Sequence, residues 1–441
     1  MGVIRLSGPD SFKIAQTLYP PLPKPRHAAL RALLDASGEV IDEGLVIAFK
    51  APHSFTGEDV VEIQAHGSPV VLGLIMNSLV SAGARPAEPG EFSKRAYLND
   101  RIDLVQAEAI ADLIGATTEQ AARAAQNSLQ GVFSKQIHAL AEDLTGLRVY
   151  VEASLDFPDE DVDFLADGEV INKAQALHER LSTLMQQAQQ GQRLNDGALV
   201  CLVGHPNVGK SSLLNALSRT DSAIVTEFAG TTRDVVREHL NLNGMPVTVS
   251  DTAGLRETQD PVEALGIQKT NDEMKKADLI VWVMDGVALA KEGLTVSALD
   301  QPQLLERLQK DYPGLVDTER LMPVINKADA IGEPAGLRDG VIYLSAKTHE
   351  GLGSFIDQMT QRLGLEENSE TQFTARARHI HAMTHAQEAL ARGIEDIRQT
   401  SSGELLAECL KEAAQALGDI TGQITADELL GHIFSSFCIG K

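Results

Sequence analysis

Short runs in which apolar and polar positions alternate mark the first hundred residues, and this period of two is typical of half-buried strands. Turn-forming stretches such as Pro20–Pro25 and Pro89-Gly90 separate the runs. The pattern predicts strands over Val3–Leu6, Leu45–Phe49 and Val60–Gln64. We interpret residues 1–99 as a small α/β domain.

From residue 100 onward the apolar positions follow helical spacing. Ile102, Val105 and Ala109 are three and four residues apart, in a stretch rich in Ala, Leu, Glu and Gln. This pattern predicts long helices over residues 100–196. The same character returns over residues 366–441.

Between these helical segments, residues 197–365 alternate strand-like and helical runs. Such alternation is typical of a doubly wound parallel sheet. The expected strands are Leu199–Val203, Val247–Ser250, Leu279–Met284, Met322–Ile325 and Val341–Leu344. The predicted fold is therefore multidomain: an α/β domain inserted into an all-α domain that the flanking segments build together, behind the N-terminal α/β domain.

Composition places the chain among ordinary soluble proteins. Its 441 residues favour two to four domains, and 43% are hydrophobic and 23% charged. No apolar stretch is long enough to span a bilayer. Three cysteines are too few for a disulfide framework, so we expect a cytoplasmic protein.

Charge limits the possible partners. The 38 basic residues against 62 acidic residues give a net charge of −24, which disfavours binding of nucleic acid by bulk electrostatics. Aromatic residues amount to 4%, so a base-stacking surface is also not expected. Any nucleic acid substrate would need a local patch or a partner protein to hold it.

A phosphate-binding loop follows the first strand of the inserted domain. The stretch from Gly204 to Ser211 reads Gly-His-Pro-Asn-Val-Gly-Lys-Ser and leads into a helix predicted over Ser212–Leu217. Glycines let backbone N–H groups point inward as an anion nest. Lys210 can hold the β- and γ-phosphates, and the Ser211 hydroxyl suits Mg²⁺. The candidate nucleotide contacts here are Asn207, Val208, Gly209, Lys210, Ser211 and Ser212.

Two further stretches fit a nucleotide triphosphate and its magnesium ion. Asp251-Thr252-Ala253-Gly254 ends a predicted strand, where Asp251 can hold Mg²⁺ through water and the Gly254 amide can contact a γ-phosphate. A threonine hydroxyl from Gly230-Thr231-Thr232 can complete the magnesium shell, and Thr232 is our candidate.

The base specificity follows from two later strand ends. Asn326-Lys327-Ala328-Asp329 and Ser345-Ala346-Lys347 each follow a predicted strand. The Asp329 carboxylate can accept from N1–H and the 2-amino group of guanine, and adenine would leave this acceptor unpaired. Backbone N–H groups of residues 345–347 can donate to O6. The inserted domain is therefore predicted to bind GTP.

Several other stretches accompany these motifs. The full sequence resembles the MnmE (TrmE) family of tRNA-modification GTPases, among the TrmE-Era-EngA-like GTPases, essentially from end to end. The stretches that carry the resemblance are Ser54-Phe55-Thr56-Gly57-Glu58-Asp59, Pro89-Gly90-Glu91-Phe92, Phe157-Pro158-Asp159-Glu160 and Phe437-Cys438-Ile439-Gly440-Lys441.

The resemblance implies a GTPase that works on tRNA. It implies a homodimer that acts with the FAD-dependent protein MnmG. Together they install an aminomethyl or carboxymethylaminomethyl group at C5 of the wobble uridine, position 34. The one-carbon unit comes from 5-formyl- or 5,10-methylene-tetrahydrofolate, which the N-terminal domain binds. Because the chain is acidic, we expect the partner to provide most of the grip on tRNA.

The resemblance also implies how GTP is hydrolysed. The position after Asp251–Gly254 is Leu255, which cannot orient water as a glutamine does. In the family a potassium ion supplies positive charge when two G domains pair, and the water-orienting carboxylate maps to Glu263. The potassium ligands map to Asn207, Thr226, Phe228 and Thr231, and the further nucleotide contacts map to Glu227, Ala229 and Gly230.

The folate contacts that the resemblance implies are scattered along the chain. They map to Arg5, Glu62, Arg101 and Lys441, where cations suit glutamyl carboxylates and a carboxylate suits the pterin edge. Cys438 is a possible thiol in the modification step, and a small buried hydrophobic role remains an alternative.

Two other function classes remain open. One is a regulatory GTPase of ribosome assembly that shares the G domain. The other is a folate-binding scaffold with a non-catalytic G domain. The acidic charge disfavours the first, and the complete set of Lys210, Ser211, Asp251 and Asp329 disfavours the second.

Overall fold

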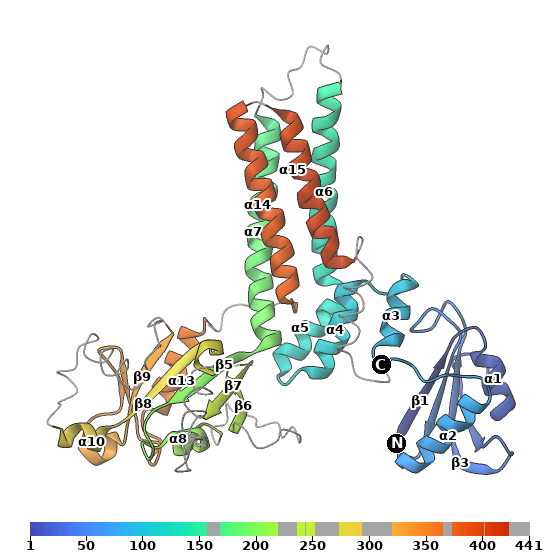
Figure 1. Cartoon of the computed structure of the whole chain (residues 1–441), viewed down its shortest axis with the longest axis horizontal. Coiled ribbons are helices and arrows are strands. Elements are labelled where there is room, and N and C mark those ends of the chain that lie inside the picture. The colour runs from blue at the N-terminus through green and yellow to red at the C-terminus, as the bar shows by residue number, and fades with distance from the viewer. Residues whose placement is uncertain are drawn as a thin grey trace, which may run out of the picture. The chain divides into compact units, whose positions relative to one another are not determined.

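The computed structural model describes residues 1–156, 168–218, 236–242, 244–251, 273–292, 320–364, 373–400 and 402–422. Contacts divide the chain into two compact units. One contains residues 1–111, 126–185 and 378–441, and the other contains residues 112–125 and 186–377. Figure 1 shows the elements of both units, most of them labelled.

The first unit begins with an antiparallel sheet in the strand order β1-β4-β3-β2. Its buried face packs Ile4, Val46 and Ile63 against Leu18 and Leu79 of two helices. The strands are β1 (Gly2–Ser7), β2 (Ala28–Leu34), β3 (Val40–Phe49) and β4 (Val60–Ala65), and the helices are α1 (Ser11–Leu18), α2 (Pro69–Ser81) and α3 (Glu91–Leu98).

The three strands that the sequence predicts in this region are confirmed. β2 was not predicted, because its sequence Ala-Ala-Leu-Arg-Ala-Leu-Leu has the composition of a helix. Pairing with seven residues of β3 overrides that local preference.

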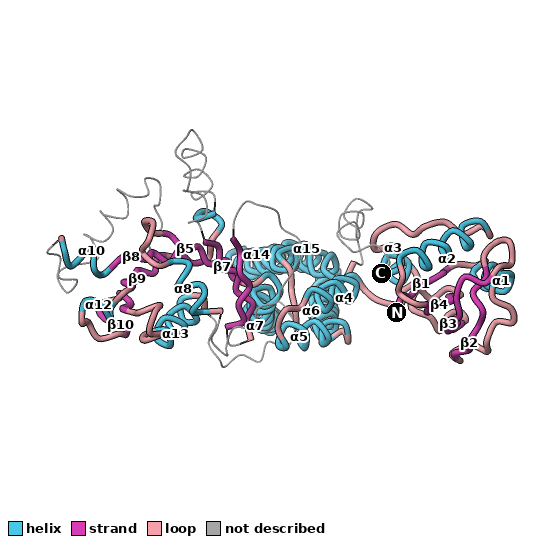
Figure 2. The backbone as a smooth tube through the Cα atoms, turned by 90° about the horizontal axis from the view of Figure 1, so that it is seen from below, coloured by secondary structure: helices cyan, strands magenta, loops and turns pink. Residues whose placement is uncertain are grey.

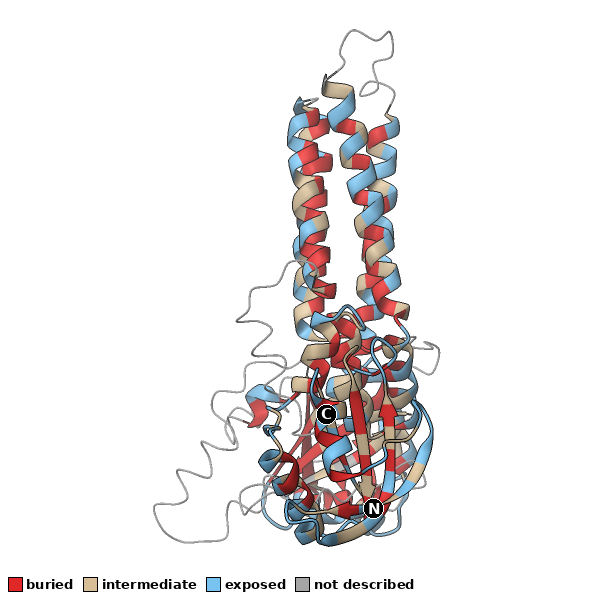
Figure 3. Ribbon diagram, turned by 90° about the vertical axis from the view of Figure 1, so that its right-hand side faces the viewer, coloured by how far each residue is buried: buried red, intermediate tan, exposed pale blue. Residues whose placement is uncertain are grey.

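Long helices make up the rest of the first unit. They are α4 (Leu104–Gly115), α5 (Glu119–Leu129), α6 (Val132–Asp156), α7 (Glu169–Asp196), α14 (Ala377–Thr400) and α15 (Gly403–Thr421), and α4, α5 and α7 continue into the second unit. Figure 3 shows the buried residues on the inward sides of the long helices. Gln387 Nε2 of α14 donates to Ser182 Oγ of α7 at 2.6 Å. Where the structure describes them, the two segments predicted from spacing are helical.

A buried ion cluster joins three of these helices. Glu108 of α4 is 2% exposed and accepts from Arg378 Nε at 2.8 Å and from Arg378 Nη2 at 2.7 Å. His379 Nε2 lies 2.9 Å from the same carboxylate. Arg378 also donates to the Ile420 carbonyl at 3.0 Å, near the end of α15. The start of α14 is therefore fixed to α4 and α15.

The second unit contains a seven-stranded sheet in the order β10-β11-β9-β8-β5-β7-β6, seen in magenta in Figure 2. Its strands are β5 (Ala198–Val203), β6 (Val236–Leu242), β7 (Met245–Asp251), β8 (Leu279–Asp285), β9 (Leu321–Asn326), β10 (Gly336–Arg338) and β11 (Val341–Tyr343). The described residues of the inserted domain form the helices α8 (Lys210–Leu217), α10 (Gly286–Lys291), α12 (Ala328–Ile331) and α13 (Leu352–Arg362).

Alternate strand residues bury the two faces of this sheet. Val200, Leu202 and Val281 pack with Leu213 and Phe355 of the helices on one face. Cys201 and Trp282 belong to the core on the other face, so the thiol of Cys201 is a core group. Strands buried on both faces are typical of doubly wound folds.

The predicted multidomain fold is confirmed, with one correction to the sheet. The five predicted strands are parallel neighbours, but β6 and β10 pair antiparallel at the two edges, so the sheet is mixed. Open α/β sheets commonly carry antiparallel edge strands. The chain leaves the helical domain through α7 and returns through α14. None of the described helices combines the length and the apolar character needed to cross a membrane.

Candidate guanine-nucleotide site

The loop after β5 adopts a conformation that requires glycine at two positions. At Gly204, with φ +150°, an added Cβ would lie 2.3 Å from the Val283 carbonyl oxygen. At Gly209, with φ +98°, it would lie 2.2 Å from Asn326 Nδ2. Asn207 also has a positive φ of 63°, a region that asparagine tolerates better than most residues. The loop therefore passes close to β8 and β9.

Lys210 is folded across this loop. Its side chain is 5% exposed, and Nζ donates to the Gly204 carbonyl at 2.7 Å and to the His205 carbonyl at 3.1 Å. The helix α8 begins at Lys210, two residues earlier than predicted, so Ser211 and Ser212 occupy its first turn and are exposed. A charged donor and a helix N-terminus at one loop are the components of a phosphate site.

Asn326 links the loops that follow three different strands. Its side chain is 3% exposed, and Nδ2 donates to the Val208 carbonyl at 2.8 Å. Oδ1 accepts from the Lys327 N–H at 2.8 Å and from the Ala346 N–H at 3.0 Å. The structure thus brings together the loop after β5 and the predicted base-recognition stretches after β9 and β11.

The base-recognition residues divide into buried and exposed groups. Ala328 and Ser345 are each 1% exposed, whereas Asp329 and Lys347 are exposed. The Ser345 N–H donates to the Glu350 carbonyl at 3.0 Å. Because the Ala346 N–H is bound to Asn326, a guanine O6 would have to replace that contact or accept from the Lys347 N–H.

Sequence reasoning missed Asp285 at the end of β8. Asp285 pairs in register with Asn326, and its Oδ2 accepts from Lys327 Nζ at 2.7 Å. Burial alone would raise the pKa of this carboxyl, but hydrogen bonds from Lys327 and from the Val287 N–H outweigh burial, and the pKa is lowered. An acidic residue directly after the apolar run Leu279–Met284 was the available signal.

Many predicted contacts lie outside the described residues. The backbone of Asp251 ends β7 beside Leu202, but its side chain is not among the described groups. The others outside are Thr226, Glu227, Phe228, Ala229, Gly230, Thr231, Thr232, Thr252, Ala253, Gly254, Glu263, Cys438 and Lys441.

The candidate folate residues fall into two places. Arg5 and Glu62 face each other on β1 and β4, and Arg5 Nε donates to Glu62 Oε1 at 2.7 Å. Arg5 also lines a cavity of about 590 Å³ between β1, α2 and α3. Arg101 lines another pocket, of about 480 Å³, with Tyr97 and His138. The structure therefore pairs two of the predicted residues and places Arg101 elsewhere.

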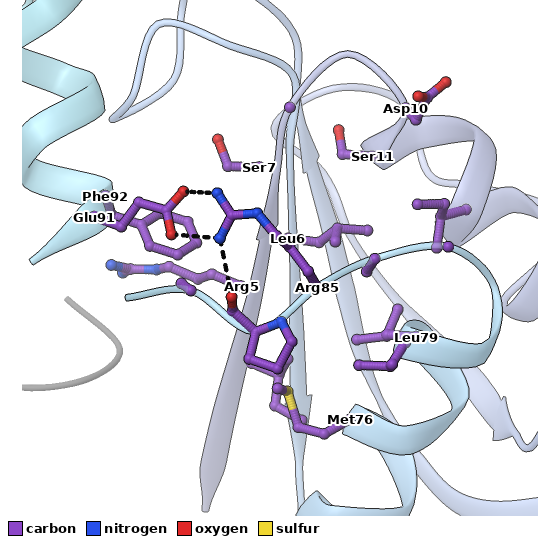
Figure 4. A pocket seen from close by; sticks show the side chains of 18 of the residues that line it. Arg5, Leu6, Ser7, Asp10, Ser11, Met76, Leu79, Arg85, Glu91 and Phe92 are labelled. Atoms are coloured by element: carbon purple, nitrogen blue, oxygen red, sulfur yellow. Dashed lines mark hydrogen bonds and ion pairs between the residues drawn. The ribbon is translucent and has the colours of Figure 1, made fainter. Parts of the chain in front are cut away.

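The cavity beside Arg5 has a charged wall and an apolar wall. Arg85 Nη2 donates to Glu91 Oε1 at 2.6 Å (Figure 4). Arg95 Nη2 donates to the same oxygen at 2.7 Å. The hydrogen bond from Arg85 is the main cause that lowers the Glu91 pKa to about 2. Leu79 lies on the opposite side.

A phosphate loop between a strand and a helix, joined by a buried asparagine to two strand-end loops, defines a P-loop GTPase. Comparison with known proteins narrows this class. The family model "MnmE helical domain" matches residues 104–438, and "GTP-binding protein TrmE N-terminus" matches residues 1–101. The chain belongs to the MnmE family.

Curated relatives match over the full chain. The tRNA modification GTPase MnmE of Pseudomonas aeruginosa (strain UCBPP-PA14) is 49% identical over 446 residues, which cover 100% of this chain and 96% of the relative. The protein of the same name from Pectobacterium carotovorum is 47% identical with the same coverage.

Solved structures are more distant matches. A variant of Aquifex aeolicus Era bound to GDP·AlF4⁻ is 21% identical, with a TM-score of 0.28, over 51% of this chain and 89% of that chain. The G domain of the T. maritima FeoB iron transporter is 19% identical, with a TM-score of 0.22, over 38% of this chain and 96% of that chain. The family assignment rests on the sequence matches.

Proposed function

We propose that this GTPase serves the modification of C5 of the wobble uridine, position 34, in tRNA. The observation that carries the proposal is the link that Asn326 makes between the phosphate loop and the two base-recognition loops. This link occurs in a chain 49% identical over its full length to a tRNA modification GTPase. GTP is the nucleotide, Mg²⁺ is held by Ser211 and Thr232, and Lys210 stabilises charge on the phosphates.

Potassium and Glu263 complete the hydrolytic site in this proposal. Asn207, Thr226, Phe228 and Thr231 would hold K⁺ when two G domains pair, and Glu263 would orient the attacking water. A cation at this place compensates the charge that develops on the leaving phosphates. The described part of this set is Asn207, whose positive φ and carbonyl contact fix its backbone.

The N-terminal domain is proposed to bind a 5-formyl- or 5,10-methylene-tetrahydrofolate. Arg5 and Glu62 form an ion pair with the arginine 41% exposed, so its guanidinium is accessible to a carboxylate. Further folate contacts in this proposal are Arg101 and Lys441. The thiol of Cys438 would take part in the modification step. Titration of 5-formyl-tetrahydrofolate into wild type and Arg5→Ala tests this, and equal affinities would remove Arg5 from the site.

The assembly is proposed to be a cytoplasmic homodimer that acts with an FAD-dependent partner. With a net charge of −24, the chain is poorly suited to hold tRNA alone. The partner would therefore supply most of the grip on the substrate.

Nucleoside analysis of tRNA from a strain lacking this gene tests the function. We expect the C5 modification of the wobble uridine to disappear and to return with the wild-type gene. Asp329→Ala should fail to restore it, because the guanine contact is lost. Normal modification in the deletion strain would exclude the proposal.

A further inference from the structure

Asp285 occupies the edge of the sheet where the nucleotide loops meet, and its two carboxylate oxygens have separate partners. Oδ1 accepts from the Val287 N–H at 2.9 Å and from the Ala288 N–H at 3.4 Å, at the start of α10. Oδ2 accepts from Lys327 Nζ at 2.7 Å. The side chain is 21% exposed, so the ion pair with Lys327 is only partly screened by solvent.

Lys327 carries the interaction from Asp285 to the phosphate loop. Besides its bond to Asp285, Nζ donates to the Asn207 carbonyl at 3.0 Å. The backbone N–H of Lys327 is bound to Asn326 Oδ1. Both ends of this lysine are therefore fixed, and the ammonium bridges an acid on β8 and a carbonyl of the phosphate loop.

Two successive carbonyls of the loop are held in this way. Lys327 binds the carbonyl of Asn207, and Asn326 binds the carbonyl of Val208. In a trans peptide the C=O and the following N–H point in opposite directions. Fixing these two carbonyls toward β9 therefore turns the N–H groups of Val208 and Gly209 the other way, as an anion nest requires.

We propose that Asp285 is a positioning residue for guanine nucleotide binding, acting through Lys327 on the peptide after Asn207. The proposal rests on the proposed GTP site, and it assigns to Asp285 a role that no sequence motif gives it. Without the carboxylate, the ammonium loses one of its two acceptors, and the loop peptide is freer to rotate before the phosphates bind.

Asp285→Asn is the sharpest variant for a test. Asparagine keeps an acceptor oxygen at the start of α10, where it is also a favoured cap, but it removes the charge that holds Lys327. We expect the affinity for GDP, measured by calorimetry, to fall about tenfold, the loss of one charge-assisted hydrogen bond.

A matched control lies at the other end of the same strand. Asp278 precedes β8 and accepts from the Leu199 N–H at 2.8 Å, away from the nucleotide loops. Asp278→Asn removes a comparable charge and should leave GDP affinity within about twofold of wild type. Thermal unfolding without nucleotide, measured for both variants, separates a loss of binding from a loss of stability.

A double-mutant cycle then tests the route through Lys327. In a Lys327→Met background, Asp285→Asn should cause no further loss of GDP affinity, because the group it acts on is gone. A tenfold loss that persists in that background would overturn the proposal, as would wild-type affinity of the single variant. A wild-type chain that binds no GDP would instead remove the proposed function, and this inference with it.

Discussion

At the scale of single residues, the site depends on close approach between backbone and side chain. The carboxamide of Asn326 makes hydrogen bonds to three partners, and it can do so because Gly209 has no side chain. Lys210 and Asn326 could be selected from the sequence because each lies in a motif that is typical of nucleotide binding. Asp285 could be noticed as an acidic residue after an apolar run, but its contact with Lys327 could not be predicted, because that contact depends on the register of β8 against β9.

Gly209→Ala should abolish most nucleotide binding. A Cβ 2.2 Å from Asn326 Nδ2, on a residue with φ +98°, would strain the backbone and displace the carboxamide. Backbone strain of about 1–2 kcal/mol and about 1 kcal/mol for a lost hydrogen bond predict a loss of about hundredfold in GDP affinity.

The control for this variant is Gly353→Ala on α13, where an added Cβ meets nothing within 4 Å. It should leave GDP affinity unchanged. Equal affinities of Gly209→Ala and wild type, measured by calorimetry, would show that the loop does not approach Asn326 in the bound state.

At the scale of elements, the spacing of apolar positions predicted most of the helices and strands. The strands that were missed have a local composition that is not typical of buried strands. Buried parallel strands such as β8 have continuous apolar runs, so they were found. Both edge strands of the seven-stranded sheet were missed: β10 has three residues, and β6 has charged residues between its apolar ones. The partners of Glu108 could not be predicted, because residues 378 and 379 lie about 270 positions away.

The Glu108 cluster should make folding of the helical domain sensitive to acid. Burial alone would raise the Glu108 pKa, but hydrogen bonds from His379 and Arg378 outweigh it and lower the pKa from 4.5 to about 2. A group with a lowered folded-state pKa stabilises the fold above its unfolded pKa, and this contribution is lost as the pH falls from about 4.5 toward 2.

Glu108→Gln should therefore destabilise the chain by about 3 kcal/mol at neutral pH, because it removes the buried charge that pairs with Arg378, which is 21% exposed, and with the buried His379. The variant should also lose part of the acid dependence of unfolding. Glu119→Gln is the control, since that side chain is 77% exposed in its pair with Arg123 and surface pairs contribute little. Denaturant unfolding at several pH values measures the stability of each variant and its acid dependence. Equal effects of the two substitutions would contradict the stabilising role of the Glu108 cluster.

At the scale of the whole molecule, the G domain interrupts the helical domain in the sequence. The helical domain is built from segments on both sides of the G domain, so the two connections at α7 and α14 both lead into the same helices. This insertion was predictable because helical spacing stops at residue 197 and resumes near 366.

Hydrolysis should depend on the identity of the monovalent cation. If K⁺ supplies the positive charge that an arginine supplies in other GTPases, replacing K⁺ by Na⁺ should slow GTP turnover by at least about tenfold at equal ionic strength. The smaller ion fits the same oxygen ligands poorly, while GDP affinity should change little. Phosphate release measured in the two salts, with the protein concentration varied, checks both the cation and the pairing of G domains.

Glu263→Ala is the companion variant. It tests the orientation of the attacking water, whereas the exchange of K⁺ for Na⁺ tests the cation that compensates the phosphate charge. This variant should bind GTP like wild type, keep its preference for K⁺ over Na⁺ in any residual turnover, and lose most of its hydrolysis. Equal turnover of wild type in the two salts would remove the cation from the mechanism. Unchanged turnover of Glu263→Ala would leave the cation in place and transfer the orientation of water to another group.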